Sequence, residues 1–326
     1  MVLSSVSFFI ICIIIYYSFR VNIKVVKKLL IQLQHVCNEL RDKNEIVIIE
    51  KYGYIAKCYT VALTVTGICT VSIIIQLLTL SDDVPSTNVT RPRRMQLVTE
   101  YFVDQEKYFF LILLHTNTAV CIGLTAMIAT GTMFIAYFKF ICGMFKISSY
   151  RIERAVKINI LQNITLKNKT LRSEDLISAV DIHRQAIQLS KQFVSKFVIM
   201  FFCLAYVFVI ALCFNFVRIF QIVCTKQAAT KIILPILCAS INILYLFISN
   251  YLGQNLTDYN NCVFDTVYRV EWYVTPLHIQ RIILFLLLKG AKNYTLNIGF
   301  FTPSLECFAM LVKASVSYFT VVLSTQ

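Results

Sequence analysis

Long hydrophobic runs alternate with polar, basic segments along the whole chain. A hydrocarbon core of about 30 Å requires about 20 apolar residues in a helix that crosses it. Six segments reach or approach that length, and we expect each to be a membrane-spanning helix: residues 2–19, 58–80, 108–138, 197–221, 232–252 and 300–325. A seventh apolar run, Ile282–Leu288, lies between Arg281 and Lys289 and is too short to cross, which predicts a buried half-helix.

The composition agrees with this pattern. Hydrophobic residues make up 58% and charged residues 15% of the 326 residues, and the mean hydropathy is +0.70, far from the mix typical of a soluble domain. The first run is short, but it stays bulky through Tyr17 without a small-residue cleavage site, so we interpret it as a span and not as a signal peptide. The prediction is an all-α polytopic membrane protein that forms one domain over residues 1–326.

The basic residues predict which side of the membrane each loop occupies, because cytoplasmic loops retain positive charge. Segments 20–57, 139–196 and 253–299 contain 8, 11 and 4 of the 31 Lys and Arg residues, whereas segments 81–107 and 223–231 contain 4 and 2. We therefore expect the first three segments to be intracellular and both termini to be extracellular.

This topology accounts for two further features. The net charge of +14 is divided among loops beside spans, so it indicates membrane topology and not a nucleic-acid partner. The sequon at Asn88 falls in an expected outer loop, where it is a candidate for glycosylation.

The expected intracellular segments have helical patterns of apolar residues. Between Asn22 and Glu50 the apolar residues recur at steps of three or four, which predicts an amphipathic helix. Those residues are Val25, Leu29, Leu33, Val36 and Leu40. A second helix is predicted to start near Ser173 and to run unbroken into the span at Phe197, with Leu176, Val180 and Ile187 on one face. Such projecting helices must cover their apolar faces, so we predict a packed intracellular bundle.

Sites for covalent or metal chemistry are absent from the sequence. The 12 cysteines are scattered singly, and the four histidines lie far apart without a partner at metal-ligand spacing. No phosphate loop, HExxH, GxSxG or paired CxxC motif is present. We therefore expect no enzyme, no disulfide framework, no metal and no cofactor.

Polar residues inside the expected spans are the next candidates, because each is costly in lipid. Arg218 lies near the outer end of its span, where it can extend to the interface and serve a structural role. His115 and Asn117 lie in the outer half of the third span. They have two interpretations, hydrogen bonding between helices or direct contact with a ligand.

The last span contains a narrow stripe of polar residues. Its members follow one another at steps of 7, 4, 3 and 4 residues, so they share one face of a helix. They are Glu306, Lys313, Ser317, Thr320 and Ser324. An unrelieved ammonium at the depth of Lys313 costs about 2.5 to 3.5 kcal/mol in lipid. The stripe therefore faces either water, enclosed by symmetry-related copies around a pore, or neighbouring helices of the same chain.

The C-terminal residues also resemble a known family. The stretch from Glu271 to Leu323, "EWYVTPLHIQRIILFLLLKGAKNYTLNIGFFTPSLECFAMLVKASVSYFTVVL", is similar to the C-terminal sequence of insect odorant receptors, with an acidic-Trp-Tyr start and an ending "FF..SLE.F........SYF...L". Two upstream stretches, "EYFVDQEKYFFLILLHTNTAVCIG" and "ICGMFKISSYRIERA", resemble the fourth span of these receptors and the stretch after it, especially in ants, bees and wasps. The resemblance covers the chain from about Lys24 onward.

The resemblance implies seven spans with an inner N-terminus and an outer C-terminus. The charge distribution agrees at the C-terminus, but only six spans are found. We interpret residues 2–19 as the second span of the family, so that the first has no counterpart here.

The resemblance further implies an odour-gated, non-selective cation channel. In such a channel a tuning receptor and the shared odorant receptor coreceptor form a hetero-tetramer in the plasma membrane of olfactory sensory neurons. Later spans make the assembly contact through their intracellular parts, and the final helix lines the pore. By comparison with the family, Val321 is expected at an apolar gate and Thr325 at a second constriction, where Thr suggests a wetter gate. The implied partners are a small volatile odorant, the coreceptor and membrane lipid.

The ligand cavity implied by the family lies in the outer half of the membrane between its second, third, fourth and sixth spans. Here these correspond to the outer parts of residues 2–19, 58–80, 108–138 and 232–252. The candidates for ligand contact form a largely apolar lining with a few polar groups, as small-molecule sites usually do. They are Phe8, Phe9, Thr70, Ile73, Leu113, His115, Asn117 and Leu237.

Three alternatives are weighed against an odorant receptor. A gustatory receptor of the same fold is disfavoured because the tail has SYF and not the TY…QF ending of that family. A G-protein-coupled receptor requires an inner C-terminus and the motifs DRY and NPxxY, which do not occur in the sequence. A truncated, non-functional fragment is the third alternative, because the first span of the family is missing.

Overall fold

The computed structural model describes residues 2–79, 107–163, 171–225, 230–290, 297–298 and 301–325. Its elements are almost entirely helical, with an isolated antiparallel bridge between Ile298 and Phe301 in the turn before the last helix. The helices are α1 (Val2–Glu39), α2 (Lys43–Thr79), α3 (Phe109–Asn163), α4 (Leu171–Cys224), α5 (Thr230–Arg269), the short 3-10 helix η2 (Trp272–Val274), α6 (Leu277–Gly290) and α7 (Leu305–Ser324).

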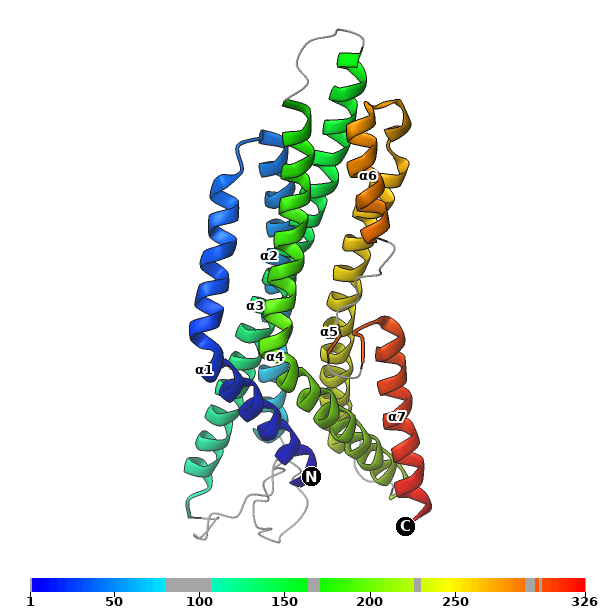
Figure 1. Ribbon diagram of the computed structural model, residues 1–326. Helices are drawn as coiled ribbons and strands as arrows, with labels where there is room; N and C mark the ends of the chain where they lie inside the picture. Colours follow the sequence, from blue (N-terminus) through cyan, green and yellow to red (C-terminus); the bar gives the residue numbers. More distant parts are fainter. Residues whose placement is uncertain are drawn as a thin grey trace.

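Six of the described helices, α1 to α5 and α7, are long and apolar enough to cross a membrane, which confirms the expected number of spans. All but α7 are far longer than crossing requires, since α3 has 55 residues and α4 has 54 against about 20 needed. The chain termini lie at one end of the bundle, and α6 and the α1–α2 turn lie toward the other (Figure 1). We call the part of the bundle beyond the expected spans the extension; its described residues are 20–57, 139–163, 171–196 and 253–290.

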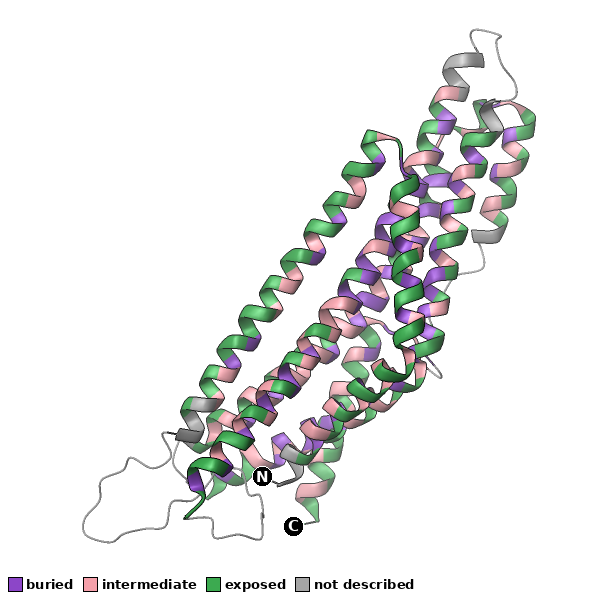
Figure 2. Cartoon of the chain, turned by 90° about the vertical axis from the view of Figure 1, so that its left-hand side faces the viewer, coloured by how far each residue is buried: buried purple, intermediate pink, exposed green. Residues whose placement is uncertain are grey.

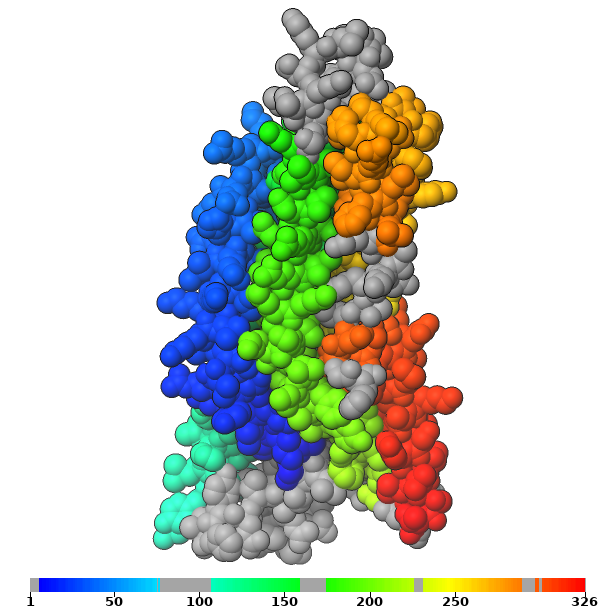
Figure 3. Space-filling model, in the orientation of Figure 1, coloured from blue at the N-terminus to red at the C-terminus, as the bar shows by residue number. Residues whose placement is uncertain are grey.

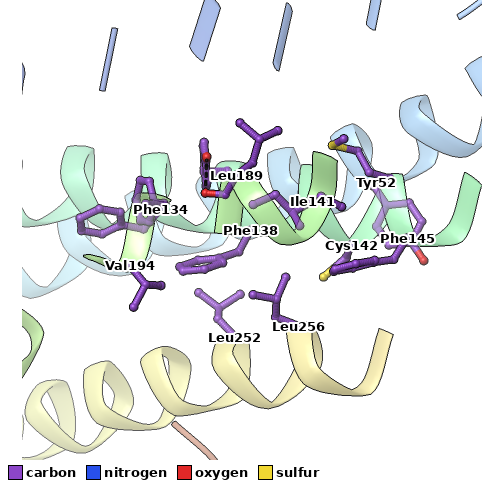
Figure 4. Packing of buried hydrophobic residues seen from close by; sticks show 14 of the residues in the cluster. Tyr52, Phe134, Phe138, Ile141, Cys142, Phe145, Leu189, Val194, Leu252 and Leu256 are labelled. Atoms are coloured by element: carbon purple, nitrogen blue, oxygen red, sulfur yellow. Dashed lines mark hydrogen bonds between the residues drawn. The ribbon is translucent and has the colours of Figure 1, made fainter. Parts of the chain in front are cut away.

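The extension has a continuous core where α3, α4 and α5 meet. Its side chains are almost inaccessible to solvent, among them Phe145, Leu176, Ala186 and Leu256, each 0% exposed. Figure 2 shows the buried residues gathered along these three helices, whereas much of α1 is exposed. Figure 4 shows Phe138 of α3 pointing toward Leu252 and Leu256 of α5. The predicted packed bundle is confirmed.

One helix predicted in the extension is broken. The pattern between Asn22 and Glu50 predicts a single amphipathic helix, but α1 ends at Glu39 and α2 begins at Lys43. The physical reason is a cap, because the Asp42 carboxylate accepts a hydrogen bond of 2.9 Å from the backbone N–H of Asn44. The chain reverses there, so α1 and α2 run in opposite directions from the turn (Figure 1), and α1 packs mainly on α4 whereas α2 packs mainly on α3.

Ion pairs hold this reversal against α3 and α4. Arg151 of α3 donates from Nε and Nη2 to both carboxylate oxygens of Glu45, at 2.7 and 2.8 Å, and from Nη1 to the Ser178 hydroxyl at 2.7 Å. Glu45 is 4% exposed, so its buried negative charge is stabilised by this bidentate ion pair. Arg154 pairs with Asp42 closer to solvent.

The short helix α6 corrects a second expectation. It was expected to be a buried half-helix, and one face is indeed buried, with Ile279 at 1% and Ile283 at 0% exposure. The opposite face is exposed although it is apolar, with Leu284, Phe285 and Leu288 between 50% and 73% exposed. Among the described long helices, α6 makes its main contacts with α5. The described part of the chain therefore covers only one face of α6.

An aromatic cluster marks the boundary between the spans and the extension. Phe134 of α3 meets Phe193 and Phe197 of α4, with ring centroids 5.2 Å apart in both cases. Phe19 of α1 joins Phe197 at 5.7 Å. The Tyr137 ring stacks on Phe193 at 4.2 Å, and its hydroxyl donates to the backbone carbonyl of α4 across the interface. The cluster locks three helices together at this level.

Candidate functional site

A mainly apolar cavity lies directly beside the aromatic cluster, on the side of the spans. Its volume is about 170 Å³, and its walls come from α2, α3, α4, α5, three residues before α7 (Ile298, Phe301 and Pro303) and α7 itself. An engineered apolar cavity of about 150 Å³ admits benzene, so this one is large enough for a small organic molecule.

The position of the cavity along the spans is consistent from helix to helix. Its lining on α2 covers residues 63–70, on α3 residues 124–138 and on α4 residues 200–208. Each of these ranges belongs to the half of its expected span that is nearer the extension. The cavity therefore lies toward the predicted intracellular side of the membrane.

The walls are largely aromatic and aliphatic. Phe134, Phe138, Phe201, Phe208 and Phe301 contribute rings, and Phe134 and Phe201 belong to the same ring contacts as the boundary cluster. Five side chains supply polar atoms: Thr66, Thr70, Tyr245, Ser249 and Asn250. Apolar walls with a few fixed polar groups are typical of sites for small organic ligands.

Glycines on α2 and α3 set the width of the cavity. A Cβ on Gly67 of α2 would overlap the Ile128 side chain of α3, so this glycine allows the two helices to approach closely. Gly131 is different, because a Cβ there would meet Tyr245 at an ordinary distance of 3.7 Å. The space above Gly131 is therefore part of the cavity.

The base of α7 forms one wall of the cavity. Leu311 of α7 and Ile298, Phe301 and Pro303 of the preceding turn line it. The turn is held in place by two backbone hydrogen bonds between Ile298 and Phe301, of 2.9 and 3.3 Å. Ser304 caps α7, since its hydroxyl accepts a hydrogen bond of 3.1 Å from the Cys307 backbone N–H. A molecule in the cavity would thus touch the segment that starts α7.

The rest of α7 has one packed face and one open face. Phe308 meets Phe247 of α5 at 5.6 Å, and Phe319 lies 6.1 Å from both Phe216 and Phe220 of α4. Ser315 on the same face is completely buried. Figure 3 shows α7 on the outer edge of the molecule, beside α4.

The open face carries the polar stripe found in the sequence. All of the candidate pore and gate residues are exposed on the single chain, and Val321 is 59% exposed. They are Lys313, Ser317, Thr320, Val321, Ser324 and Thr325. Glu306 is exposed too. The alternative that the stripe packs against other helices of the same chain is therefore wrong for the residues that the structure describes.

Of the eight candidates for ligand contact, Thr70 lines the cavity and the other seven do not. Phe8 and Phe9 of α1 lie 5.5 Å apart, and the Phe8 ring faces Gly123 of α3. Ile73 is 38% exposed and His115 is exposed. These seven residues lie toward the terminal end of the bundle and remain predictions for an outer site.

The remaining candidates are half-buried. Leu113, Asn117 and Leu237 have intermediate exposure on α3 and α5. The Oδ1 atom of Asn117 is buried without a hydrogen-bond partner among the described residues. The glycosylation candidate Asn88 lies outside the described residues.

Sequence reasoning missed most of the cavity lining, above all Tyr245 and Gly131. Polar and small residues within apolar spans were the available signal, because Thr66, Tyr245, Ser249 and Asn250 interrupt such runs. These residues were not among the candidates because the family resemblance implies a ligand cavity in the outer half of the membrane.

Comparison with known proteins identifies the family. The family model described as "7tm Odorant receptor" matches residues 1–316. Odorant receptor 22c of Drosophila melanogaster is 25% identical over 194 residues, which cover 57% of this chain and 46% of the relative. The match thus spans just under half of the length of that curated relative.

Solved structures show the same fold. The insect olfactory receptor OR5 from Machilis hrabei superposes with a TM-score of 0.78 over 99% of this chain and 80% of the other, at 16% identity. The same receptor in complex with eugenol gives a TM-score of 0.73 over 99% and 81% of the two chains, also at 16% identity.

These findings settle the class of protein. The family match supports an odorant receptor over the gustatory receptor and the G-protein-coupled receptor considered above, and it agrees with the expectation that the chain is not an enzyme. It is a multi-pass membrane protein. Because that family model matches residues 1–316, which is nearly the whole chain, the chain belongs to the 7tm odorant receptor family of insects.

Proposed function

We propose that this chain is the odorant-binding subunit of a ligand-gated, non-selective cation channel that it forms with the shared odorant receptor coreceptor. One observation carries the proposal: the cavity and the open polar face of α7 belong to the same short unit of structure. Leu311 lines the cavity, whereas Lys313 and Ser317 are exposed within two turns of it on the same helix. An occupant of the cavity that favours one position of α7 thereby shifts the population of channel states.

The ligand is a small volatile organic molecule. Its recognition relies on the aromatic and aliphatic walls, and the cavity volume of about 170 Å³ limits its size. The solved complex of the Machilis hrabei receptor with eugenol, an odorant of this kind, agrees with such a ligand. The outer candidates Phe8, Phe9, Ile73, Leu113, His115, Asn117 and Leu237 are proposed to form a separate contact region nearer the terminal end.

The permeation path is proposed to run along α7 of several subunits. Lys313, Ser317, Thr320 and Ser324 offer a water-facing surface, and no carboxylate lies within ion-pair distance of Lys313 among the described residues. In lipid that exposed ammonium would be costly. A water-filled path enclosed by partner subunits removes this cost, with Val321 at the gate and Thr325 at a second constriction.

The partner contact is proposed to lie in the extension. Leu284 and Leu288 are 50% and 73% exposed on the apolar face of α6, as far as the described residues show. The proposed topology puts this face in the cytoplasm, outside the lipid, so burial against a coreceptor subunit would stabilise the assembly. The expected location is the plasma membrane of olfactory sensory neurons.

The decisive experiment is a recording of odour-evoked current from cells that express this chain with the coreceptor, using a panel of volatile compounds that includes eugenol. Ala205 on α4 lines the cavity, so Ala205→Phe should fill it and raise the concentration for half-maximal current more than tenfold. Ala62 on α2 is exposed and lies outside the cavity lining, so Ala62→Phe is the matched control and should leave that concentration unchanged.

The result can also contradict the proposal. If Ala205→Phe and Ala62→Phe have equal effects on the response, the cavity is not the site of odour binding. If the assembled complex reaches the cell surface and no compound in the panel evokes current, the non-functional fragment becomes the better description.

A further inference from the structure

The polar groups of the cavity differ in whether they can still donate or accept a hydrogen bond. Thr66 and Thr70 of α2 donate their hydroxyl protons to carbonyl oxygens of their own helix, those of Ala62 and Gly67, both at 2.8 Å. Ser249 of α5 does the same toward Leu246 at 3.0 Å. Asn250 directs one of its N–H bonds to the same carbonyl at 2.9 Å. These four side chains have therefore used donor capacity inside the protein.

Their acceptor capacity is retained. A hydroxyl oxygen that donates its proton to a backbone carbonyl keeps two lone pairs, so Thr70 Oγ1 can accept a hydrogen bond without losing the one it makes. Thr70 is 7% exposed in an apolar wall, so water does not compete freely for this oxygen. Free donors are fewer among the described residues: the backbone N–H groups of the helical walls are paired within their helices, and the N–H groups of Ile298 and Phe301 bond to each other's carbonyl oxygens.

The wall on α2 is thus an acceptor without a free donor. A ligand carbonyl can accept from the α5 side through the second N–H of Asn250, since the Tyr245 hydroxyl is already hydrogen-bonded to Thr130. On the α2 side such a carbonyl would have to turn the Thr70 hydroxyl away from Gly67. A ligand hydroxyl can donate to Thr70 Oγ1 and still accept from the α5 side. One additional hydrogen bond is available to an alcohol or phenol, and to no ketone, aldehyde or ester.

We infer that the cavity selects small ligands that carry a hydroxyl group over carbonyl compounds of the same carbon skeleton, and that Thr70 determines this selectivity. The inference rests on the proposed odorant-binding function and names the ligand class that the same site takes. One net hydrogen bond in a protein interior corresponds to a preference of about threefold to tenfold, and a site built to pair a ligand hydroxyl discriminates against analogues that lack it.

The test uses benzyl alcohol and benzaldehyde, which share a ring of the size that the cavity admits. Dissociation constants come from the rise in unfolding temperature of the purified complex of this chain with the coreceptor as each compound is added. In the wild type, benzyl alcohol should bind about threefold to tenfold more tightly than benzaldehyde. Thr70→Val preserves the shape and removes the acceptor, so the ratio of the two constants should fall toward one.

Two further variants separate the hydrogen bond from effects of packing. Thr70→Ser keeps a hydroxyl oxygen and should keep most of the preference. Thr64 lies on the exposed side of α2 and makes the same kind of bond, to Thr60 at 2.8 Å, so Thr64→Val is the matched control and should leave the ratio unchanged. Both compounds are used on every variant, so their different partition into the membrane cancels in the comparison.

The outcomes distinguish the inference from the proposed function. Equal binding of the two compounds to the wild type, or no binding of either, overturns the ligand class, as does a Thr70→Val variant that weakens both compounds equally. The wild-type comparison decides even if Thr70→Val fails to fold. Binding with the expected preference but without any current from the assembled complex supports the ligand class and overturns the channel function.

Discussion

Gly253 of α5 lies directly against Pro303, the residue that ends the turn before α7. A Cβ on Gly253 would overlap the proline ring and would lie 3.0 Å from the Pro303 carbonyl oxygen. Both residues line the cavity. The contact is thus a close approach of helix α5 to the start of the helix that we propose to line the pore, and it exists because residue 253 has no side chain.

Gly253→Ala is expected to displace this turn and to reduce the maximal odour-evoked current, because the base of α7 must move away from α5. The displacement should also lower the free energy of unfolding by about 1 to 3 kcal/mol, as overpacking does. Gly53→Ala is the matched control, since no atom lies within 4 Å of a Cβ at that exposed helical position. It should raise stability by up to about 1 kcal/mol. Equal currents from the two variants would show that the contact does not matter for opening.

Arg151→Ala should destabilise the extension strongly, because it leaves the carboxylate of Glu45 buried without the arginine that pairs with both of its oxygens. The expected loss is about 3 kcal/mol in the free energy of unfolding. Arg154→Ala removes the nearby pair with Asp42, whose arginine side chain is 50% exposed, and should cost less than about 1 kcal/mol. Thermal unfolding of the purified complex measures both losses. A larger loss of stability in Arg154→Ala than in Arg151→Ala would contradict the greater importance of the buried Arg151–Glu45 pair.

The burial of His183 should make the stability of the folded protein depend on pH. It lies in the extension, beyond the expected span of residues 197–221, between the rings of Phe145 and Phe264 at 5.5 and 5.3 Å. Its Nε2 atom lies 3.0 Å from Asn260 Oδ1. Burial lowers the pKa of His183 below its ordinary value of 6.5, because the charged imidazolium loses its hydration there.

The sign of the effect follows from this lowered pKa. Above about pH 6.5 the imidazole is neutral in the folded and the unfolded chain, so its contribution is fully present. As the pH falls toward the pKa of the folded state, the unfolded chain binds a proton that the folded chain does not, and stability declines. The unfolding temperature of the wild type should therefore drop between pH 7.5 and pH 5.5 by more than that of His183→Gln. His35→Gln, at an exposed position of α1, should behave as the wild type does.

Thr325→Leu tests the proposed gate. Apolar side chains around a constriction favour its dewetting, so leucine should lower the current that flows in the absence of odour. Thr118 on α3 is also exposed and bonds back to its own helix, as Thr325 does, at 2.8 and 2.9 Å respectively. Thr118→Leu is thus a control for added bulk on the membrane face. An unchanged basal current in Thr325→Leu would argue against a constriction at that position.

The spans and the packed extension were predictable because each follows from a local rule. Lipid requires long apolar helices, and water-exposed helices require a period of three or four in their apolar residues. The break between α1 and α2 was also readable in principle, since Asp42 followed three residues later by Glu45 is a typical helix start. The continuous apolar period through Leu40, in contrast, predicts one unbroken helix.

The cavity and the exposed face of α6 follow from no local rule. The cavity is what remains after four helices, a turn and the base of α7 have packed, so the positions of Gly131 and Tyr245 acquire meaning only in three dimensions. The run Ile282–Leu288 is apolar on every side, and sequence alone does not show which side another subunit covers. The stripe on α7 was readable because its polar members repeat on one helical face, but its outward direction required the packing of Phe308 and Phe319.

Leu311 belongs both to the cavity lining and to α7. This double position constrains how a receptor with this fold can diverge after gene duplication. If the cavity binds the odorant as we propose, replacements on α5 or α7 alter ligand selectivity and channel opening together, so selection on one property disturbs the other. The α2 side lines the cavity with Leu63 and Thr70, whereas α7 packs on α4 and α5. New sensitivities can thus accumulate on α2 at little risk to conduction.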